Sequence, residues 1–406
     1  MRRVVITGMG IYSCIGKNRE EVRDSLYYGR SGVGLDLSRK EMGFRSCLTG
    51  IIDPPNLKDQ LDRKQRATLS EQGNYACAAT LEALEQAKID MDFLSHNEVG
   101  ILYGNDSCVE PIVNTIDITR SKKDNTLIGS ASVFKSMNST ITMNLAVILN
   151  LKGINMTISG ACASGSHSVG LGHLLIQQGL QDIIICGGAQ EVNTLSMASL
   201  DGLGLFSMQE NEPKKASRPF DRDRDGLVPS GGGATIILES YESAVKRGIT
   251  PLGEVLGYGF SSNGNHNIST PDANGLQRSL EMAIKQADIP IEKIKYINAH
   301  ATSTPKGDAE EASAIAEIFK NHNPYVASTK SITGNEMWMS GASEIIYALL
   351  MMHNNFIAPN INFENPDEAS AKLNIPNKKI DIQFETFLSN SSGFGGTNST
   401  LIIQKI

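Results

Sequence analysis

The sequence predicts an α/β fold built from two similar halves. Short runs rich in β-branched residues alternate with longer stretches in which apolar residues recur at helical spacing, and this alternation is typical of α/β proteins. A chain of 406 residues, 40% of them hydrophobic, also exceeds the size at which one core usually stops growing. The predicted strands are Val4–Thr7, Val99–Tyr103, Ile183–Cys186, Ala234–Leu238 and Lys295–Asn298.

Two predicted helices indicate a duplication. The helix Gln72–Ile89 and the helix Gly275–Asp288 are each followed by a short polar link and a predicted strand. Their ends share residues at the same spacing: Ala83, Gln86, Ala87 and Ile89 recur as Ala283, Gln286, Ala287 and Ile289. The polar turn Lys246–Pro251 is the expected seam. We therefore expect an N-terminal unit of residues 1–245 and a C-terminal unit of residues 246–406.

Composition excludes several classes of function. The net charge of −7 and the pI near 5.6 argue against nucleic acid as a partner, which requires a dominant basic face. No window approaches eighteen apolar residues, so no membrane span is expected. Six scattered cysteines, without a C-x-x-C pair, fit free thiols in a reducing cytoplasm and do not predict a metal site.

Two motifs begin like known ligand-binding loops but each lacks a residue that the loop requires. Asp221-Arg-Asp-Arg-Asp-Gly226 begins like a calcium loop, but Gly232 stands where a bidentate glutamate is required. Gly8-Met-Gly10 begins like a dinucleotide fingerprint, but Ser13 replaces the third glycine. We therefore expect no metal and no nucleotide cofactor.

The segment around Cys162 has the pattern of a nucleophile on a strand-to-helix turn. A strand-like entry from Met156 leads into Gly160-Ala-Cys162-Ala-Ser, and a helix is predicted from there to about Gln178. Small flanking residues allow the sharp turn that leaves a side chain exposed. A helix N-terminus favours the thiolate, so a lowered pKa is expected for Cys162. A structural role for this turn is equally compatible with the pattern. Cys186 ends an apolar run and is expected to be a buried core thiol.

Three later segments carry further candidate residues. His300 ends a predicted strand and precedes a hydroxyl-rich loop, a place suited to a cleft. His167 and His173 lie on the helix after Cys162 and are expected to be packed there. Ser328-Thr-Lys330-Ser-Ile-Thr-Gly-Asn335 is followed by Glu344. Asn390-Ser-Ser-Gly-Phe394-Gly-Gly-Thr-Asn398 offers backbone N–H groups of the kind that hold an oxyanion.

Together these segments resemble the β-ketoacyl-acyl carrier protein synthase family, in the elongating type I/II branch of the thiolase superfamily. The resemblance covers nearly the whole chain and includes the opening Val4-Val-Ile-Thr-Gly-Met-Gly, the segment Ser217-Arg-Pro-Phe-Asp221 and the four motifs in family order. It implies a thiolase-like fold, in which duplicated α/β halves form five layers, αβαβα.

The resemblance also implies roles for individual residues. Cys162 matches the nucleophile, His300 the first active-site histidine, and Lys330 with Glu344 a conserved ion pair. The backbone amides of Cys162 and Phe394 match the oxyanion hole. Contacts with the pantetheine arm and the substrate are implied for four small side chains: Thr302, Thr304, Ser392 and Cys108. Docking of the carrier protein is implied for three basic residues: Arg63, Lys64 and Arg66.

The sequence departs from the family pattern at three places. Asn335 stands where elongating synthases have a second histidine, so the site reads Cys-His-Asn, as in initiating synthases and plant-type polyketide synthases. An amide donates a hydrogen bond to an enolate but transfers no proton, so His300 would carry any proton transfer. Ser392 replaces the first phenylalanine of the gating loop, and Ser230-Gly231-Gly232 replaces Gly-Glu-Gly.

The implied reaction is a decarboxylative condensation of an acyl thioester, held on Cys162, with malonyl-acyl carrier protein, in fatty acid or polyketide-like biosynthesis. No cofactor is implied, because the substrates are carried on phosphopantetheine. The implied partners are the carrier protein and a second copy of the chain, or a chain-length partner in a heterodimer. Two alternatives stay open: an acyltransferase or thioesterase-like homologue that does not condense, and a non-catalytic chain-length subunit.

Overall fold

The computed structural model describes residues 1–269 and 271–406. Its main sheet contains two sets of five strands with the same topology. The first set has the spatial order β1-β7-β6-β4-β5 and the second the order β8-β14-β13-β9-β10. The first set comprises β1 (Val4–Ser13), β4 (Val99–Gly104), β5 (Asn155–Ile158), β6 (Ile183–Gln190) and β7 (Gly232–Ser240). The second comprises β8 (Gly253–Ser262), β9 (Tyr296–Asn298), β10 (Tyr325–Ala327), β13 (Thr386–Gly393) and β14 (Thr397–Gln404).

Strand directions repeat as well as strand order. In the first set β4 is parallel to β5 and β6, and β7 is antiparallel to β6 and β1. In the second set β9 is parallel to β10 and β13, and β14 is antiparallel to β13 and β8. A short antiparallel pairing of β1 with β8, at Val5–Glu254 and Ile6–Gly253, joins the sets.

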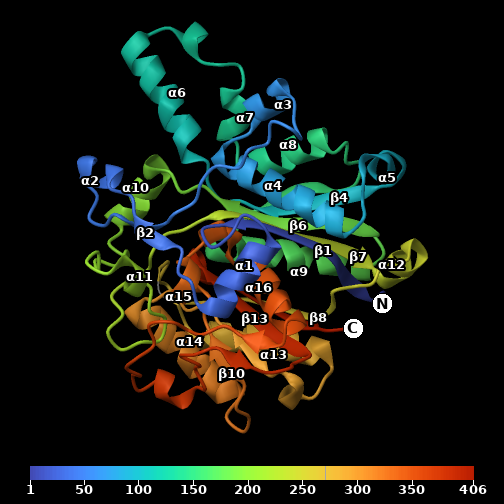
Figure 1. Cartoon of the computed structure of the whole chain (residues 1–406), viewed down its shortest axis with the longest axis vertical. Coiled ribbons are helices and arrows are strands. Elements are labelled where there is room, and N and C mark those ends of the chain that lie inside the picture. The colour runs from blue at the N-terminus through green and yellow to red at the C-terminus, as the bar shows by residue number, and fades with distance from the viewer. Residues whose placement is uncertain (270) are drawn as a thin grey trace.

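Helices cover both outer faces and fill the space between the two sets of strands (Figure 1). The central helices are α9 (Ser164–Gln177) and α16 (Ser340–His353), whose apolar residues share one core with β1, β7, β8 and β14. A second core lies between the first strand set and α4 (Glu71–Gln86) and α8 (Thr140–Ile148). A third lies between the second set and α13 (Ala273–Ala287) and α14 (Pro305–Ile318). The layers are therefore outer helices, the first strand set, the central helices, the second strand set and outer helices. This arrangement confirms the predicted thiolase-like αβαβα fold.

The predicted repeat marks equivalent packing contacts. A Cβ on Gly10 of β1 would lie 2.0 Å from Ala79 O of α4, and a Cβ on Gly259 of β8 would lie 1.9 Å from Ser279 O of α13. The repeated glutamines serve the same purpose: Met9 N donates to Gln86 Oε1 at 2.9 Å, and Tyr258 N donates to Gln286 Oε1 at 3.1 Å.

The strand expected over Val4–Thr7 continues to Ser13, so its predicted end was wrong. Gly8 and Gly10 lie within this strand, where α4 packs directly on their backbone. Helix ends shift by a few residues from those expected. The strand-like entry at Met156 is β5, and β8, β10, β13 and β14 extend the sheet beyond the predicted strands.

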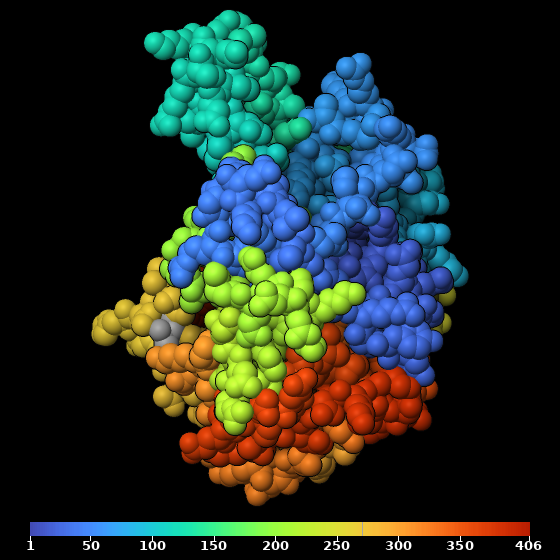
Figure 2. Space-filling view, turned by 60° about the vertical axis from the view of Figure 1, so that its left-hand side comes forward, coloured from blue at the N-terminus to red at the C-terminus, as the bar shows by residue number. Residues whose placement is uncertain are grey.

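The remaining elements lie around this framework. A segment containing α6 projects from the body of the molecule (Figures 1 and 2). Among the described residues no helix combines the length and apolar character needed to cross a bilayer. The other helices are α1 (Arg19–Tyr28), α2 (Ser38–Glu41), α3 (Arg63–Thr68), α5 (Met91–His96), α6 (Val109–Lys122), α7 (Ser132–Ser136), α10 (Thr194–Gly202), α11 (Pro213–Ala216), α12 (Tyr241–Arg247) and α15 (Lys330–Thr333). Two small ribbons pair β2 (Val33–Leu35) with β3 (Leu48–Gly50) and β11 (Phe356–Ile357) with β12 (Ile380–Asp381).

Candidate active site

Cys162 lies on a tight turn between β5 and α9, as the sequence predicts. The 3₁₀ turn Ala161–Ala163 leads directly into the helix. Ala161 has a left-handed backbone with φ of 46°, and its N–H donates to Asp106 Oδ2 at 2.9 Å. A left-handed alanine costs on the order of 1 kcal/mol and persists only where its surroundings hold it. The strained turn therefore fixes the position of the thiol.

Tight packing of α9 against α16 brings Asn335 next to Cys162. A Cβ on Gly341 of α16 would lie 2.4 Å from Ser166 Cβ of α9, so only glycine permits this approach. Asn335 precedes α16, and its Nδ2 lies 3.8 Å from Cys162 Sγ. Its Oδ1 accepts hydrogen bonds from Met337 N and Ser340 Oγ, each at 3.3 Å. These bonds orient the amide so that its N–H₂ group faces the sulfur.

A cavity of about 320 Å³ opens at the cysteine. Candidate residues from four segments that are far apart in the sequence line this cavity. Thr302 Oγ1 and Thr304 Oγ1 lie 3.2 Å apart, and Ser392 Oγ donates to Asn398 Oδ1 at 2.8 Å. The candidates that line the cavity are Cys162, His300, Thr302, Thr304, Asn335, Ser392 and Phe394.

The expectation of a lowered pKa for Cys162 was wrong. The side chain is 6% exposed, and burial raises the pKa of the thiol to about 11. The hydrogen bond from Asn335 and the charge of Lys330 oppose this shift without cancelling it. The free thiol is therefore neutral near pH 7, and it must pass its proton to an acceptor before it can react as a nucleophile.

The imidazole of His300 lines the same cavity as the thiol. Burial, reinforced by the positive charge of Lys330, holds the pKa of its imidazole well below the usual range. The ring is therefore neutral near pH 7. Its Nδ1 atom is buried and has no hydrogen-bond partner among the described residues. A neutral ring with a free nitrogen can donate or accept one proton inside the cavity.

Lys330 and Glu344 form a buried ion pair outside the cavity wall. Lys330 Nζ contacts Glu344 Oε1, and the two side chains are 2% and 1% exposed. Burial raises the pKa of Glu344, and the Lys330 charge opposes that shift. Lys330 and Glu344 thus form the predicted ion pair. The positive charge of Lys330 acts on the pKa values of His300 and Cys162.

Comparison with known proteins places the whole chain in one family. Residues 1–244 match "Beta-ketoacyl synthase, N-terminal domain", and residues 252–364 match "Beta-ketoacyl synthase, C-terminal domain". The "3-oxoacyl-[acyl-carrier-protein] synthase 1" of Haemophilus influenzae is 40% identical over 409 residues, which cover 100% of this chain and 99% of that protein. The crystal structure of a beta-ketoacyl synthase from Burkholderia phymatum superimposes with a TM-score of 0.94 at 33% identity, covering 100% of both chains.

The chain belongs to the β-ketoacyl synthase family. This confirms the predicted resemblance and the prediction of a condensing acyltransferase. A further structural relative is a type II polyketide synthase acyl-carrier protein in complex with its ketosynthase, with a TM-score of 0.89, 27% identity and 100% coverage of both chains.

Other candidate residues of this β-ketoacyl synthase lie outside the cavity. Cys108 is buried, receives hydrogen bonds from Gln72 and Asn105, and does not line the cavity formed by the described residues. Its predicted substrate contact stays a prediction. The predicted docking residues lie on α3, where Arg63 and Lys64 are exposed and Arg66 is partly buried.

The secondary histidine and cysteine predictions are confirmed. His167 Nδ1 lies 2.6 Å from Tyr258 Oη and His167 Nε2 lies 2.7 Å from Thr397 Oγ1, so this ring is engaged in packing. Burial lowers the pKa of His167 to about 4, and that of His173 likewise. Cys186 is completely buried in the central core.

Two buried carboxylates that sequence reasoning missed hold the His300 loop. Glu311 accepts hydrogen bonds from His300 N at 2.8 Å, Ala301 N at 2.7 Å and Asn390 Nδ2 at 2.6 Å. Asp308 Oδ1 accepts from Thr302 N at 3.0 Å and Thr304 N at 3.2 Å. Both carboxylates lie in the first turns of α14. Acidic residues shortly after a polar loop are a usable sequence signal, because helix N-termini favour negative charge.

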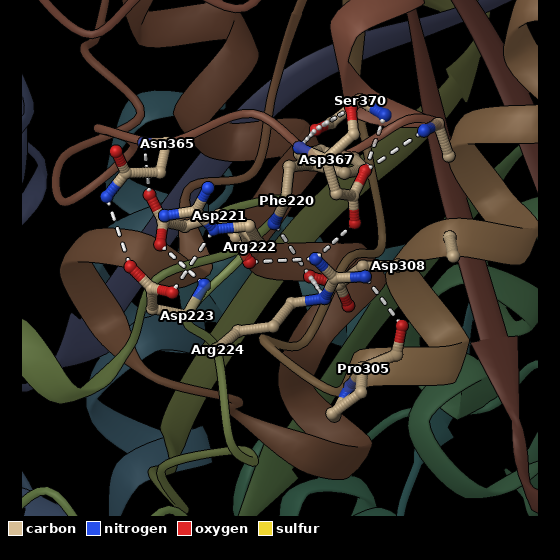
Figure 3. Close-up of polar contacts among 12 residues, drawn as sticks. Phe220, Asp221, Arg222, Asp223, Arg224, Pro305, Asp308, Asn365, Asp367 and Ser370 are labelled. Atoms are coloured by element: carbon tan, nitrogen blue, oxygen red, sulfur yellow. Dashed lines mark hydrogen bonds and ion pairs between the residues drawn. The ribbon is translucent and has the colours of Figure 1, made fainter.

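The acidic motif that imitates a calcium loop has a structural role in the same region (Figure 3). Asp221 Oδ2 accepts from Glu364 N and Asn365 N, each at 2.8 Å. The Arg224 guanidinium donates to Thr304 O at 3.1 Å, Pro305 O at 2.6 Å and Asp367 Oδ2 at 2.6 Å. Arg224 therefore fixes the backbone that carries Thr304. The Asp221 and Arg224 side chains of this motif are hydrogen-bonded to other residues of the chain.

Proposed function

We propose that this chain is a 3-oxoacyl-[acyl-carrier-protein] synthase in which Cys162, His300 and Asn335 carry out the condensation. The observation that carries the proposal is the meeting of a buried thiol, a neutral imidazole and an amide N–H₂ group in one cavity. The proposed reaction needs no metal or redox cofactor, because decarboxylation itself generates the carbon nucleophile.

The first step transfers the acyl group to the enzyme. The Cys162 thiol gives its proton to His300, the sulfur attacks the acyl thioester carbonyl, and the carrier's C–S bond breaks. The carrier thiolate leaves with the proton from His300. The backbone amides of Cys162 and Phe394 are proposed to hold the oxyanion. Thr302 and Thr304 are proposed to contact the pantetheine arm along the cavity wall, and Ser392 and Cys108 to contact the substrate.

The second step forms the carbon–carbon bond. The malonyl C–C bond to the carboxylate breaks, carbon dioxide leaves, and its electron pair generates an enolate on the carrier thioester. His300 and Asn335 each donate one hydrogen bond to the enolate oxygen, and Lys330 with Glu344 sets the local field. The enolate carbon then attacks the acyl-Cys162 thioester, whose C–S bond breaks to give the 3-oxoacyl product and a free thiolate. That thiolate takes up a proton from water, relayed by His300 because Asn335 carries no titratable proton.

Several features support proposals about partners and location. The exposed Arg63 and Lys64 and the half-buried Arg66 form a basic face suited to an acidic carrier protein. A homodimer, or a heterodimer with a chain-length partner, is supported by the edge strand β5 with its exposed Met156, 53% accessible. A cytoplasmic location is supported by six cysteines that are all free thiols. The repeat of the strand sets supports a division into residues 1–245 and 246–406.

The test of the proposed function measures two steps separately. Incubation with an acyl carrier protein thioester should add one acyl group, detected by intact-protein mass spectrometry and mapped to Cys162. Addition of malonyl carrier protein should then release carbon dioxide and 3-oxoacyl product. Cys162→Ala should lose acylation and condensation, whereas Cys186→Ala, in the central core, should retain both.

The same assay discriminates the alternatives. Acyl-enzyme formation without release of carbon dioxide would favour an acyltransferase or thioesterase-like enzyme. A folded protein that takes up no acyl group would favour a non-catalytic chain-length subunit. Condensation by Cys162→Ala would exclude the proposed mechanism.

A further inference from the structure

The surroundings of Cys162 differ on its two sides. The cavity reaches the sulfur along the wall that carries His300, Thr302 and Thr304. On the other side the cysteine packs directly against an apolar cluster. Leu227 of that cluster, and Leu205 and Phe394 packed against it, also line the cavity, whereas Met337 and Trp338 are not among the described residues of its wall. The cluster around Cys162 contains Ala161, Met197, Phe206, Leu227, Met337 and Trp338.

Trp338, the single tryptophan of the sequence, is held rigidly in this cluster. Its side chain is 8% exposed, and its Nε1–H donates to Ser107 Oγ at 3.1 Å. An indole has only two side-chain torsions, so one hydrogen bond and close packing suffice to fix it. The ring is therefore poorly suited to move aside for a flexible chain.

Met337 is fixed by its backbone as well as by packing. It is 2% exposed, and its left-handed backbone has φ of 49°. Its N–H donates to Asn335 Oδ1 at 3.3 Å, and its sulfur lies 3.4 Å from Asn335 Nδ2. Strained backbone conformations of this kind cluster at functional sites, where the surrounding structure holds them.

We propose that Met337 and Trp338 close the acyl side of Cys162 and restrict the enzyme to short acyl groups. This inference rests on the proposed function. During condensation the pantetheine arm of the malonyl unit occupies the cavity beside Thr302 and Thr304, so the acyl chain on the sulfur must extend to the other side. There Met337 and Trp338, 2% and 8% exposed, occupy the space into which a long chain would extend. The substrate class is therefore a short-chain acyl thioester.

The test is the chain-length profile of Cys162 acylation. Wild type, Trp338→Leu and Met337→Ala are incubated with acetyl, butyryl, hexanoyl, octanoyl and dodecanoyl carrier protein, and acylation rates are read by intact-protein mass spectrometry. One methylene that a pocket cannot hold changes a rate by about tenfold or more. Wild type should therefore accept butyryl at least about tenfold faster than octanoyl. In both variants that ratio should fall toward one.

Phe387→Leu is the matched control, because it removes similar apolar bulk from the central core away from Cys162. It should lower thermal stability without changing the butyryl-to-octanoyl ratio. If Trp338→Leu does not fold, Met337→Ala gives the same readout. Equal rates for all lengths in wild type, or an unchanged ratio in a folded variant, would refute the closed acyl side and leave the proposed function intact. A folded wild type that accepts no acyl group would refute both.

Discussion

The two strand sets share a scaffold and differ in the loops that follow their strands. In the first set β5 leads into Cys162 and then α9, whereas in the second set β10 leads into Lys330 and then α16. The segment after β4 contains Asp106 and Cys108, and the corresponding segment after β9 contains His300 and Thr302. The same topological positions thus carry Cys162, the proposed nucleophile, in one set and charged and titratable groups in the other. The cavity lies where these loops meet.

The two regions also stabilise their functional loops differently. The Cys162 turn is held by a strained alanine, one carboxylate contact and apolar packing. The second set holds its loops with buried carboxylates, including Glu311, Glu336 and Glu344, each at most 4% exposed. Buried charges of this kind need hydrogen-bond partners and shift their pKa values. The comparison indicates that the Cys162 turn depends on backbone strain and apolar packing, while the loops of the second set depend on buried ionisable groups that are sensitive to pH and substitution.

The largest expected effect comes from breaking the common scaffold. Gly10→Val and Gly259→Val should each destabilise the fold by more than about 4 kcal/mol, because even a Cβ would lie about 2 Å from a helix carbonyl oxygen. Thermal unfolding and expression as folded protein measure the effect. Gly202→Ala, in α10 with open space around the added Cβ, is the control and should be nearly neutral. If only one of the two valine variants unfolds, the two sets do not depend on their glycine contacts equally.

Much of this scaffold was predictable from sequence, because its signals are local. Ala83, Gln86 and their counterparts Ala283 and Gln286 revealed the repeat, since helix packing on a strand demands the same residues each time. The approximate positions of the nucleophile and histidine followed from motifs. The raised pKa of Cys162 did not follow, because burial of the thiol in its apolar cluster depends on tertiary packing. The support of His300 by Glu311 was missed because it requires knowledge of where α14 begins relative to the loop.

A smaller effect is expected from the buried ion pair of Lys330 and Glu344, for which the described residues give Cys162 no equivalent pair. Lys330→Met should destabilise the protein by about 3–5 kcal/mol, because it leaves the Glu344 carboxylate buried without its partner. The double variant Lys330→Met/Glu344→Leu should be more stable than the single variant, since both charges are removed. Urea unfolding of the two variants checks this order. A single variant as stable as the double would show that the pair contributes little to holding this loop.

The smallest expected effect is a pH dependence that arises from Glu336 in the second set. Burial raises the pKa of Glu336 from 4.5 to about 7, although Ser343 and Tyr347 donate hydrogen bonds to it. A folded-state pKa above the unfolded value means that its stabilising contribution is complete below pH 4.5 and is lost as pH rises through about 7. Glu336→Gln removes this titration. The unfolding free energy of wild type should therefore fall relative to that of Glu336→Gln by on the order of 2–3 kcal/mol across this range. Urea unfolding at a series of pH values measures the difference, in which titrations of groups common to both proteins cancel. Parallel curves for the two proteins would mean that Glu336 keeps an ordinary pKa, and that the pH sensitivity assigned to the second set has another origin.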